Sequence, residues 1–342
     1  MSVSASESLL VADIGGTNAR FGIWYQGDLL FEQVLKCASY AGPAAAAGKY
    51  LADFRASAPA AIAQRRADAG PVPLPRRAAF AVAGPLLTDR VALTNNGWDF
   101  SATETRKAIG LERLMFLNDF TALALAVPEL KDAEKHQVGG GAPVADSAMA
   151  VLGPGTGLGV SGLLRTADGW LAIQGEGGHV TLPPVDEREI AVVTRLHRQY
   201  SHVSAERILC GDGMELLHRT LALVDGLPPG ELKAEQITRA ALDGSDARCR
   251  DTVSMFCGWL GNVAGNLALT LGSRGGVYIG GGIVPRLGEF FATSPFRTRF
   301  EAKGRFTTFL AGIPVYVITA AYPALSGCVQ AFNHASPRLE AG

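Results

Sequence analysis

The sequence LLVADI at Leu9–Ile14 is an apolar run, followed by the turn Gly15-Gly16-Thr17-Asn18 and by an alternating stretch at 19–25. This order predicts a buried strand, a glycine turn and a second strand, with a third strand at 29–34. The glycines leave the backbone amides of the turn uncovered, and Thr17 adds a hydroxyl donor. The turn is therefore typical of a loop that binds phosphate.

The same order of features returns in the middle of the chain. An apolar run at 148–152 precedes the turn Gly153-Pro154-Gly155-Thr156-Gly157, and further strands are predicted at 158–164 and 170–174. Two ordinary hairpins would give a similar pattern. However, the Gly-Thr pairs occupy matching places in the two turns, which favours an internal duplication. Two such turns could hold one triphosphate from both sides.

Two familiar phosphate-binding loops are excluded. The sequence has no G-x-x-x-x-G-K-[ST] stretch, and the dinucleotide fingerprint requires a helix directly after its glycines, where this sequence predicts a strand. Beyond residue 176 the chain is mostly helical by pattern, with short apolar strands between the helices. The helices are predicted at 186–200, 204–222, 234–242 and 249–271, and late strands at 276–279 and 315–318. The fold class is therefore α/β with mixed sheets.

Length, charge and cysteine content exclude several classes of protein. The 342 residues suggest two domains at roughly 150 residues each. With 31 basic and 32 acidic residues, the chain lacks the basic excess of a nucleic-acid-binding protein. The longest uncharged stretch, 147–164, contains Pro154 and five glycines, so it predicts strands around a loop rather than a membrane helix. Without a secretory signal or paired cysteines, we expect a cytoplasmic protein.

Asp13 stands inside the first apolar strand, directly before the glycine turn. A carboxylate is costly to bury there unless it is paired or faces a ligand or a cation. One interpretation is a carboxylate that accepts hydrogen bonds from the amides of the turn. The other is an acid that faces Mg²⁺ bound to a phosphate group.

The run Ala12–Arg20 resembles the first phosphate segment of the superfamily of sugar kinases, actin and heat-shock ATPases, and more closely the opening of proteobacterial glucokinases. Further matching segments follow in the same order as far as about residue 330. They are Asn95-Asn96-Gly97-Trp98, Leu117-Asn118-Asp119-Phe120, Gly155-Thr156-Gly157-Leu158-Gly159, Gly175-Glu176-Gly177-Gly178-His179, Ser204-Ala205-Glu206-Arg207 and Gly280-Gly281-Gly282-Ile283. The Ala-rich stretch 42–75 departs from the family pattern.

The resemblance implies a two-domain actin-like (ribonuclease H-like) sugar kinase fold with mixed sheets around a deep cleft. The small domain would comprise residues 1–120 plus 318–342, and the large domain residues 121–317. It also implies ATP-dependent phosphorylation of D-glucose to glucose 6-phosphate with Mg²⁺, by a homodimer. The residues that would hold the nucleotide are Asp13 (through Mg²⁺ and water), Gly15, Gly16, Thr17, Asn18, Gly155, Thr156, Gly157, Gly281 and Gly282.

Asn118 and Asp119 lie between a predicted buried strand and a helix. Both residue types are good helix caps, so a purely structural role would explain them. A carboxylate at the end of a strand can also accept a proton from an attacking alcohol. The resemblance makes Asp119 the general base for the 6-hydroxyl of the sugar and Asn118 a ligand of a neighbouring hydroxyl.

Glu176 and His179 flank two glycines, and this is either an ordinary polar loop or a turn that offers an acceptor and a donor to adjacent sugar hydroxyls. Glu206 falls in the first turn of a predicted helix, where the helix dipole alone would favour an acid. The resemblance makes all three sugar ligands. Zinc-bearing relatives carry a cysteine cluster after the Glu-Gly-Gly-His segment, and this chain has none. The resemblance therefore implies the zinc-free branch of the family, in which His179 would contact the sugar instead of a metal ion.

Two alternatives stay open: a kinase for another hexose, and a sugar-sensing regulator on the same scaffold. A regulator would not need a base at Asp119. The remaining five histidines and the basic residues Arg297, Arg299, Lys303 and Arg305 are assigned to the solvated surface.

Overall fold

The computed structural model describes residues 7–65, 72–84, 86, 88–93, 97–333 and 339–340. The quoted Asn95 and Asn96, and residues 66–71 of the Ala-rich stretch, lie outside these ranges. The chain divides into two compact units. Unit 1 comprises Met1–Leu130, Thr166–Gln174 and Ala320–Gly342, and unit 2 comprises Lys131–Arg165 and Gly175–Thr319. The domain boundaries expected from the sequence, 1–120 with 318–342 and 121–317, remain a prediction.

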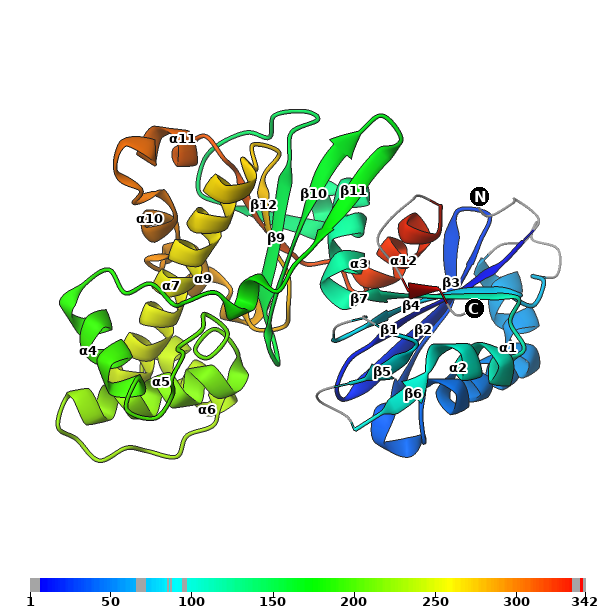
Figure 1. Ribbon diagram of the computed structural model, residues 1–342, viewed down its shortest axis with the longest axis horizontal. Coiled ribbons are helices and arrows are strands. Elements are labelled where there is room, and N and C mark those ends of the chain that lie inside the picture. The colour runs from blue at the N-terminus through cyan, green and yellow to red at the C-terminus, as the bar shows by residue number, and fades with distance from the viewer. Residues whose placement is uncertain are drawn as a thin grey trace. The chain divides into compact units, whose positions relative to one another are not determined.

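The first sheet has the strand order β14-β7-β4-β1-β2-β3. Its strands are β1 (Leu9–Ile14), β2 (Asn18–Tyr25), β3 (Asp28–Lys36), β4 (Arg77–Val82), β7 (Arg113–Asn118) and β14 (Leu339–Glu340). The helices of this unit are α1 (Pro43–Arg65), α2 (Ala102–Ile109), α3 (Asp119–Ala126) and α12 (Pro323–Asn333), and a small hairpin is formed by β5 (Arg90–Ala92) and β6 (Asp99–Ser101). Helices α1 and α2 cover one face of the sheet, and α3 and α12 cover the other (Figure 1).

The second sheet repeats this plan with the order β11-β10-β9-β12-β13-β8. Its strands are β8 (Lys135–Val138), β9 (Met149–Pro154), β10 (Leu158–Thr166), β11 (Gly169–Gln174), β12 (Val277–Ile279) and β13 (Val315–Ile318). In the first sheet, β1 is antiparallel to β2 and parallel to β4. In the second sheet, β9 is likewise antiparallel to β10 and parallel to β12. Strand β4 is parallel to β7, which is antiparallel to β14. In the same way, β12 is parallel to β13, which is antiparallel to β8. The predicted internal duplication is confirmed.

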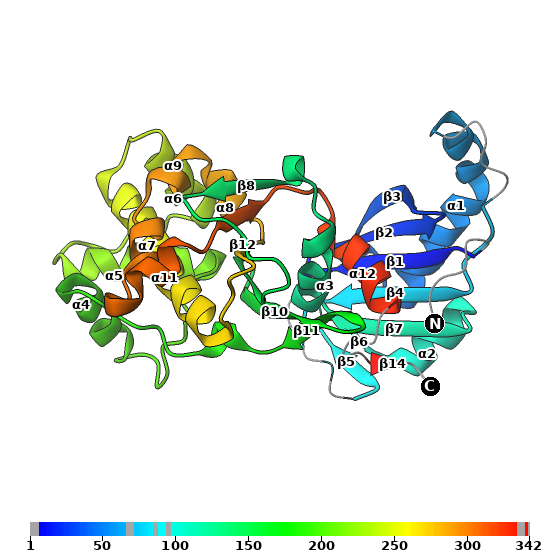
Figure 2. The same ribbon diagram turned by 90° about the horizontal axis from the view of Figure 1, so that it is seen from above.

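Most of the regular secondary structure of unit 2 is helical (Figure 2). They are α4 (Glu187–Leu196), α5 (Gly211–Val224), α6 (Ala234–Leu242), α7 (Ala247–Leu271), α8 (Val284–Leu287), α9 (Glu289–Thr293), α10 (Phe296–Glu301) and α11 (Thr307–Ala311). Short 3₁₀ helices are η1 (Cys37–Ser39), η2 (Val127–Glu129), η3 (Asp132–Glu134), η4 (Gly177–His179) and η5 (Gly304–Phe306). Within the described part of the chain, no helix combines the length and apolarity needed to cross a membrane.

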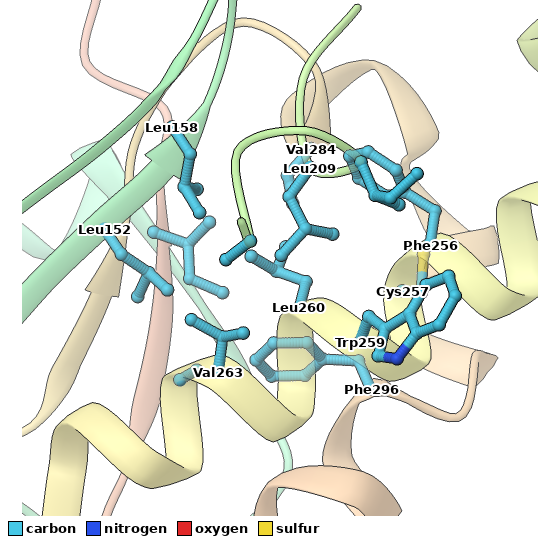
Figure 3. Close-up of a cluster of buried hydrophobic side chains, with 14 of the residues drawn as sticks. Leu152, Leu158, Leu209, Phe256, Cys257, Trp259, Leu260, Val263, Val284 and Phe296 are labelled. Carbon is cyan, nitrogen blue, oxygen red and sulfur yellow. The ribbon is translucent and has the colours of Figure 1, made fainter. Parts of the chain in front are cut away.

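The long helix α7 packs against the second sheet through buried apolar side chains. Its buried Phe256, Trp259, Leu260 and Val263 pack among side chains from β9, β10 and α10 (Figure 3). Helix α10 approaches closely because α7 has a glycine at the crossing: a Cβ atom at Gly261 would lie 2.1 Å from the Phe296 carbonyl oxygen. This dense core gives a rigid base to the turn between β9 and β10.

The predicted helix at 204–222 begins later than the sequence pattern suggests. Helix α5 starts at Gly211, and the residues before it bond to another segment. The Ala205 amide donates to the Val180 carbonyl, and the Glu206 amide donates to the Gly178 carbonyl, each at 2.8 Å. These bonds tie the segment to residues 178–180, and the next amides, of Arg207 and Ile208, form i→i−3 turns rather than a continuous helix.

The assignment of the remaining histidines and four basic residues to the solvated surface is also wrong in part. The His218 side chain is buried beneath α7 and only 2% exposed. The Arg297 guanidinium donates to the carbonyls of Ile313 and Ala311, each at 3.0 Å, and Arg299 donates to the buried Glu189 at 2.8 Å. Long basic side chains can cover apolar surface and still find partners, which composition alone does not reveal.

Candidate active site

The turn between β1 and β2 is held by one backbone hydrogen bond within the turn and one from η1. The Gly15 amide donates to the Asn18 carbonyl at 3.0 Å, and the Cys37 amide donates to the Thr17 carbonyl at 2.9 Å. Thr17 is exposed at the tip of this turn. The predicted phosphate-binding residues of the first unit therefore form one ordered loop, with the Thr17 side chain accessible to a ligand.

Asp13 pairs with a neighbour that neither sequence interpretation included. Its Oδ2 accepts a hydrogen bond from Arg20 Nη1 at 3.0 Å, because the two residues are opposite each other in the β1–β2 register. The side chain is only 19% exposed. Burial raises the pKa of the Asp13 carboxyl, and the positive charge of Arg20 opposes this shift. A second cation beside this carboxylate would offset more of the cost of burying it.

The surroundings of Asp13 suit a hydrated Mg²⁺ ion. Side chains alternate between the two faces of a strand, so the Asn18 side chain lies on the same face of β2 as Arg20, the residue that pairs with Asp13. Asn18 Oδ1 is buried and accepts no hydrogen bond from the described part of the chain, so a metal-bound water would satisfy it. Three or more His, Cys, Asp or Glu side chains do not converge anywhere in the described residues. One carboxylate with waters and substrate phosphates is nevertheless a common Mg²⁺ arrangement.

Asn118 and Asp119 lie at the same edge of the first sheet as Asp13. Ile14 of β1 is in register with Val82 of β4, which is in register with Asn118 of β7. Parallel strands end together, so the glycine turn and the Asn118-Asp119 pair stand two strands apart, roughly 10 Å. The sheet topology thus brings together two segments that are a hundred residues apart in the sequence.

The capping role foreseen for this pair is confirmed for Asn118. Its Oδ1 accepts hydrogen bonds from the amides of Phe120 at 2.9 Å and Thr121 at 3.1 Å. The Nδ2 group of Asn118 donates one long hydrogen bond to the Gly84 carbonyl at 3.5 Å, and its second N–H is left for another partner. Asp119 is the first residue of α3, and its Oδ1 accepts from the Phe120 amide at 2.9 Å. Both side chains are half-buried.

In unit 2, the turn between β9 and β10 packs against the segment 280–282. A Cβ atom on Gly153 would lie 2.4 Å from the Gly280 backbone, and one on Gly281, where φ is +77°, would lie 2.3 Å from the Pro154 carbonyl oxygen. The Gly211 amide at the start of α5 donates to the Gly155 carbonyl at 3.0 Å. Two glycine clusters that are distant in the sequence therefore meet backbone to backbone.

A pocket of about 960 Å³ opens beside this turn. Gly155, Thr156 and Gly282 line it, together with residues of α5, α6 and α8. Its volume is at the upper end of the ~300–1,000 Å³ typical of small-molecule sites. Gly282, one of the predicted nucleotide residues, and the second Gly-Thr turn thus line one cavity.

Sequence reasoning missed the α6 wall of this pocket. The cavity is lined by two rows of side chains on α6 and its C-terminal cap. One row is Ala234, Thr238 and Leu242, and the other is Glu235, Arg239 and the cap residue Asp243. Both rows have a spacing of four residues, which would have been visible as amphipathic periodicity. Periodicity alone, however, does not say whether a helix face meets a core or a ligand.

The predicted sugar ligands of unit 2 are partly brought together. Glu206 Oε1 lies 3.8 Å from His179 Nε2, and Glu206 Oε2 accepts from the Leu158 amide at 2.8 Å. The His179 side chain is 60% exposed and that of Glu206 is 32% exposed. Glu176 is exposed at the start of η4. Because Glu206 precedes α5 by five residues, the helix-dipole explanation of this acid is wrong.

Comparison with known proteins agrees with this arrangement. The family model for glucokinase matches residues 10–335. A glucokinase from Chromobacterium violaceum is 48% identical over 332 residues, which cover 97% of this chain and 91% of that protein. The chain belongs to the glucokinase family. A solved glucokinase from an Antarctic psychrotroph is 35% identical, with a TM-score of 0.81 over 95% of this chain and 98% of the other.

Membership of the glucokinase family makes the chain a sugar kinase, and the predicted two-domain sugar kinase fold of class α/β is confirmed. A more distant solved structure shows likeness of fold alone. It is a ROK family glucokinase from Streptomyces griseus in complex with glucose and AMPPNP, 18% identical, with a TM-score of 0.58 over 95% of this chain and 98% of the other.

Proposed function

We propose that this member of the glucokinase family transfers the γ-phosphoryl group of ATP to the 6-hydroxyl of D-glucose, with Asp119 as the general base. The products are glucose 6-phosphate and ADP. The observation that carries the proposal is the shared edge of the first sheet, where the Gly15–Asn18 turn and the Asn118-Asp119 pair end neighbouring parallel strands. Phosphoryl transfer requires mainly positioning and charge neutralisation, so one base beside a phosphate-binding turn is sufficient.

The proposed role of Asp119 is to accept the proton that the 6-hydroxyl loses as it attacks. A carboxylate within hydrogen-bond reach of the alcohol serves this purpose. Asn118 supports the same step. Its Oδ1 is engaged as a helix cap, and one hydrogen of its Nδ2 is directed to the Gly84 carbonyl, so the second Nδ2 hydrogen would donate to a neighbouring sugar hydroxyl. The cap also fixes the first turn of α3, which carries Asp119.

The proposed glucose ligands of unit 2 are Glu176, His179 and Glu206. A carboxylate and an imidazole 3.8 Å apart offer an acceptor and a donor to adjacent hydroxyls. Polar sites of this kind discriminate strongly against a sugar that lacks a hydroxyl, because their own groups are then left unpaired.

For the nucleotide, we propose that the adenosine occupies the pocket beside Gly155 and Gly282, and that Gly157, Gly281, Gly15 and Gly16 complete the turns around it and its phosphates. The glucose and AMPPNP held by the Streptomyces griseus glucokinase support this choice of substrates. Thr17 and Thr156 would donate hydroxyl hydrogen bonds to the phosphates. Asp13, with Asn18 behind it, would hold the waters of Mg²⁺, which when bound supplies charge neutralisation.

The proposal is tested by a coupled assay of the purified protein against glucose, fructose, mannose and N-acetylglucosamine with ATP and Mg²⁺. We expect kcat/KM to be highest for glucose. A higher value for another hexose would replace glucose as the substrate, and no turnover of any sugar, together with measurable sugar binding, would indicate a sensor.

Three further expectations accompany the proposal. The protein is expected to form a homodimer, to act in the cytoplasm and to work without zinc. Light scattering coupled to size-exclusion chromatography checks the first, and metal analysis of active enzyme checks the third.

A further inference from the structure

Three segments of unit 2 meet at Glu206. Its main-chain amide donates to the Gly178 carbonyl at 2.8 Å, within the turn that carries His179. Its Oε2 accepts from the Leu158 amide at 2.8 Å, at the end of the Gly-Thr-Gly turn. The other oxygen, Oε1, is the one near His179 Nε2. The Leu158 amide therefore decides which way the carboxylate is turned.

Gly157 belongs to this contact because it lacks a side chain. A Cβ atom built there would lie 2.5 Å from Glu206 Oε2 and 3.3 Å from Glu206 Cδ. No real Cβ atom tolerates the shorter distance, so one group would have to move. The group in question is the far end of a flexible side chain, which can move without disturbing the fold.

We infer that Gly157 and Leu158, in the turn assigned to the nucleotide, are positioning residues for glucose: they orient the Glu206 carboxylate so that Oε1 and His179 face the sugar together. The inference rests on the proposed role of Glu206 as a glucose ligand. It adds a specific physical link between the nucleotide turn and the sugar ligands, made by the 2.8 Å hydrogen bond and by the missing Cβ atom.

The link gives Gly157 a requirement that the other glycine of the Gly-Thr-Gly turn does not share. Gly155, in the same turn, has no atom within 4 Å of its Cβ position, so an alanine there would meet open space. Neither Gly155 nor Gly157 has a backbone conformation in the left-handed region. The two positions therefore form a matched pair that differs in the proximity of Glu206.

The test measures glucose binding without nucleotide, by isothermal titration calorimetry, for Gly157→Ala and Gly155→Ala. We expect Gly157→Ala to weaken glucose binding by ~10–100-fold, the range for losing a hydrogen bond to a charged group. Gly155→Ala should keep the glucose dissociation constant of the original protein, whatever it does to ATP. Equal binding by both variants and the original protein would overturn the inference.

A double variant separates this link from a general effect of the extra methyl group. If Gly157→Ala acts through Glu206, it should cause no further loss of glucose affinity when combined with Glu206→Ala. The same loss in both backgrounds would overturn the inference. Thermal denaturation checks folding. If Gly157→Ala does not fold, Glu206→Asp replaces it, because the shorter carboxylate cannot reach both the Leu158 amide and His179, and undiminished binding would then overturn the inference.

The two proposals fail in different ways. If the original protein binds no glucose, the proposed function is wrong. If the original protein and Gly157→Ala bind glucose equally well, the substrate assignment stands and only the positioning role is wrong.

Discussion

The two glycine turns of the duplicated sheets resemble each other in sequence but are held differently. Each turn is closed by a backbone hydrogen bond of its own, from the Gly15 amide to the Asn18 carbonyl and from the Gly155 amide to the Gly157 carbonyl. A Cβ atom at Gly15 would make only an ordinary contact at 3.7 Å. The turn at 153–157 is enclosed by other segments, with Gly153 against Gly280 and Gly157 against Glu206. The duplicated turn therefore leaves room beside Gly15 in unit 1 but is tightly packed at Gly153 and Gly157 in unit 2.

Their charges differ as well. When the Gly-Thr pairs are matched, Asp13 of the first strand corresponds to Leu152 of β9, which is fully buried. A carboxylate that faces a cation is therefore present in only one of the two sheets. Of the two turns, only the first therefore has a carboxylate at the position proposed for Mg²⁺.

The largest expected effect tests whether unit 1 supplies the chemistry. Asp119→Asn keeps a side-chain oxygen for the Phe120 amide but removes the base, so kcat should fall by ~10²–10⁴ with little change in glucose binding. A coupled assay and calorimetry measure the two quantities. Asp168→Asn, in an exposed turn, is the control for loss of a charge. If Asp119→Asn retained most of its turnover, Asp119 would be a structural residue only.

The next effect compares the packing of the two turns directly. Gly153→Ala would force a Cβ atom to within 2.4 Å of the Gly280 backbone, which cannot move independently, and we expect a loss of roughly 2–4 kcal/mol of stability. Gly15→Ala has room for its methyl group and should change stability by about 1 kcal/mol or less. Chemical denaturation measures both. Equal losses would show that the two turns are equally packed.

A smaller effect tests whether both turns hold one triphosphate. Thr17→Val and Thr156→Val each remove a hydroxyl at nearly constant volume, and each should raise the KM for ATP by about ten-fold. If the turns share one ligand, the double variant should depart from the product of the single effects. The glucose KM serves as the control. A change in glucose KM with unaltered ATP kinetics would contradict the phosphate assignment.

The smallest expected effect is a loss of folding stability at acidic pH that arises from a buried histidine of unit 2. Burial lowers the pKa of His218, assisted by the positive charge of Arg248. The unfolded chain therefore binds a proton as the pH falls below about 6.5, and folded unit 2 does not. The stability of unit 2 should fall as the pH drops from this value toward the lowered pKa of folded His218. His218→Gln should reduce the difference in Tm between pH 7.5 and pH 5.5. His197→Gln, an exposed neighbour, should leave that difference unchanged.

Much of this fold could be predicted because its signals are local. Apolar runs, glycine turns and the matched Gly-Thr pairs indicated the duplicated strands, and the Asn118-Asp119 pair indicated a strand-to-helix junction. The boundaries of α5 were less predictable. The Ser204–Cys210 stretch has helical composition, but the amides of Ala205 and Glu206 bond to the carbonyls of Val180 and Gly178, and the amides that follow form only local turns. Such cross-segment hydrogen bonds override local propensity and leave no trace in the composition.

The candidate site divides in the same way. The sequence by itself determined the duplicated turns, the residue types near the phosphates and the resemblance to glucokinases, since these depend on neighbours in the chain. Only the tertiary structure decided that Asp13 pairs with Arg20, that α6 lines the pocket beside Gly155 and that Glu206 accepts a hydrogen bond from the Leu158 amide. Each of these depends on which distant segments come within 3–4 Å, and that distance is set by sheet register and by the glycines that permit close approach.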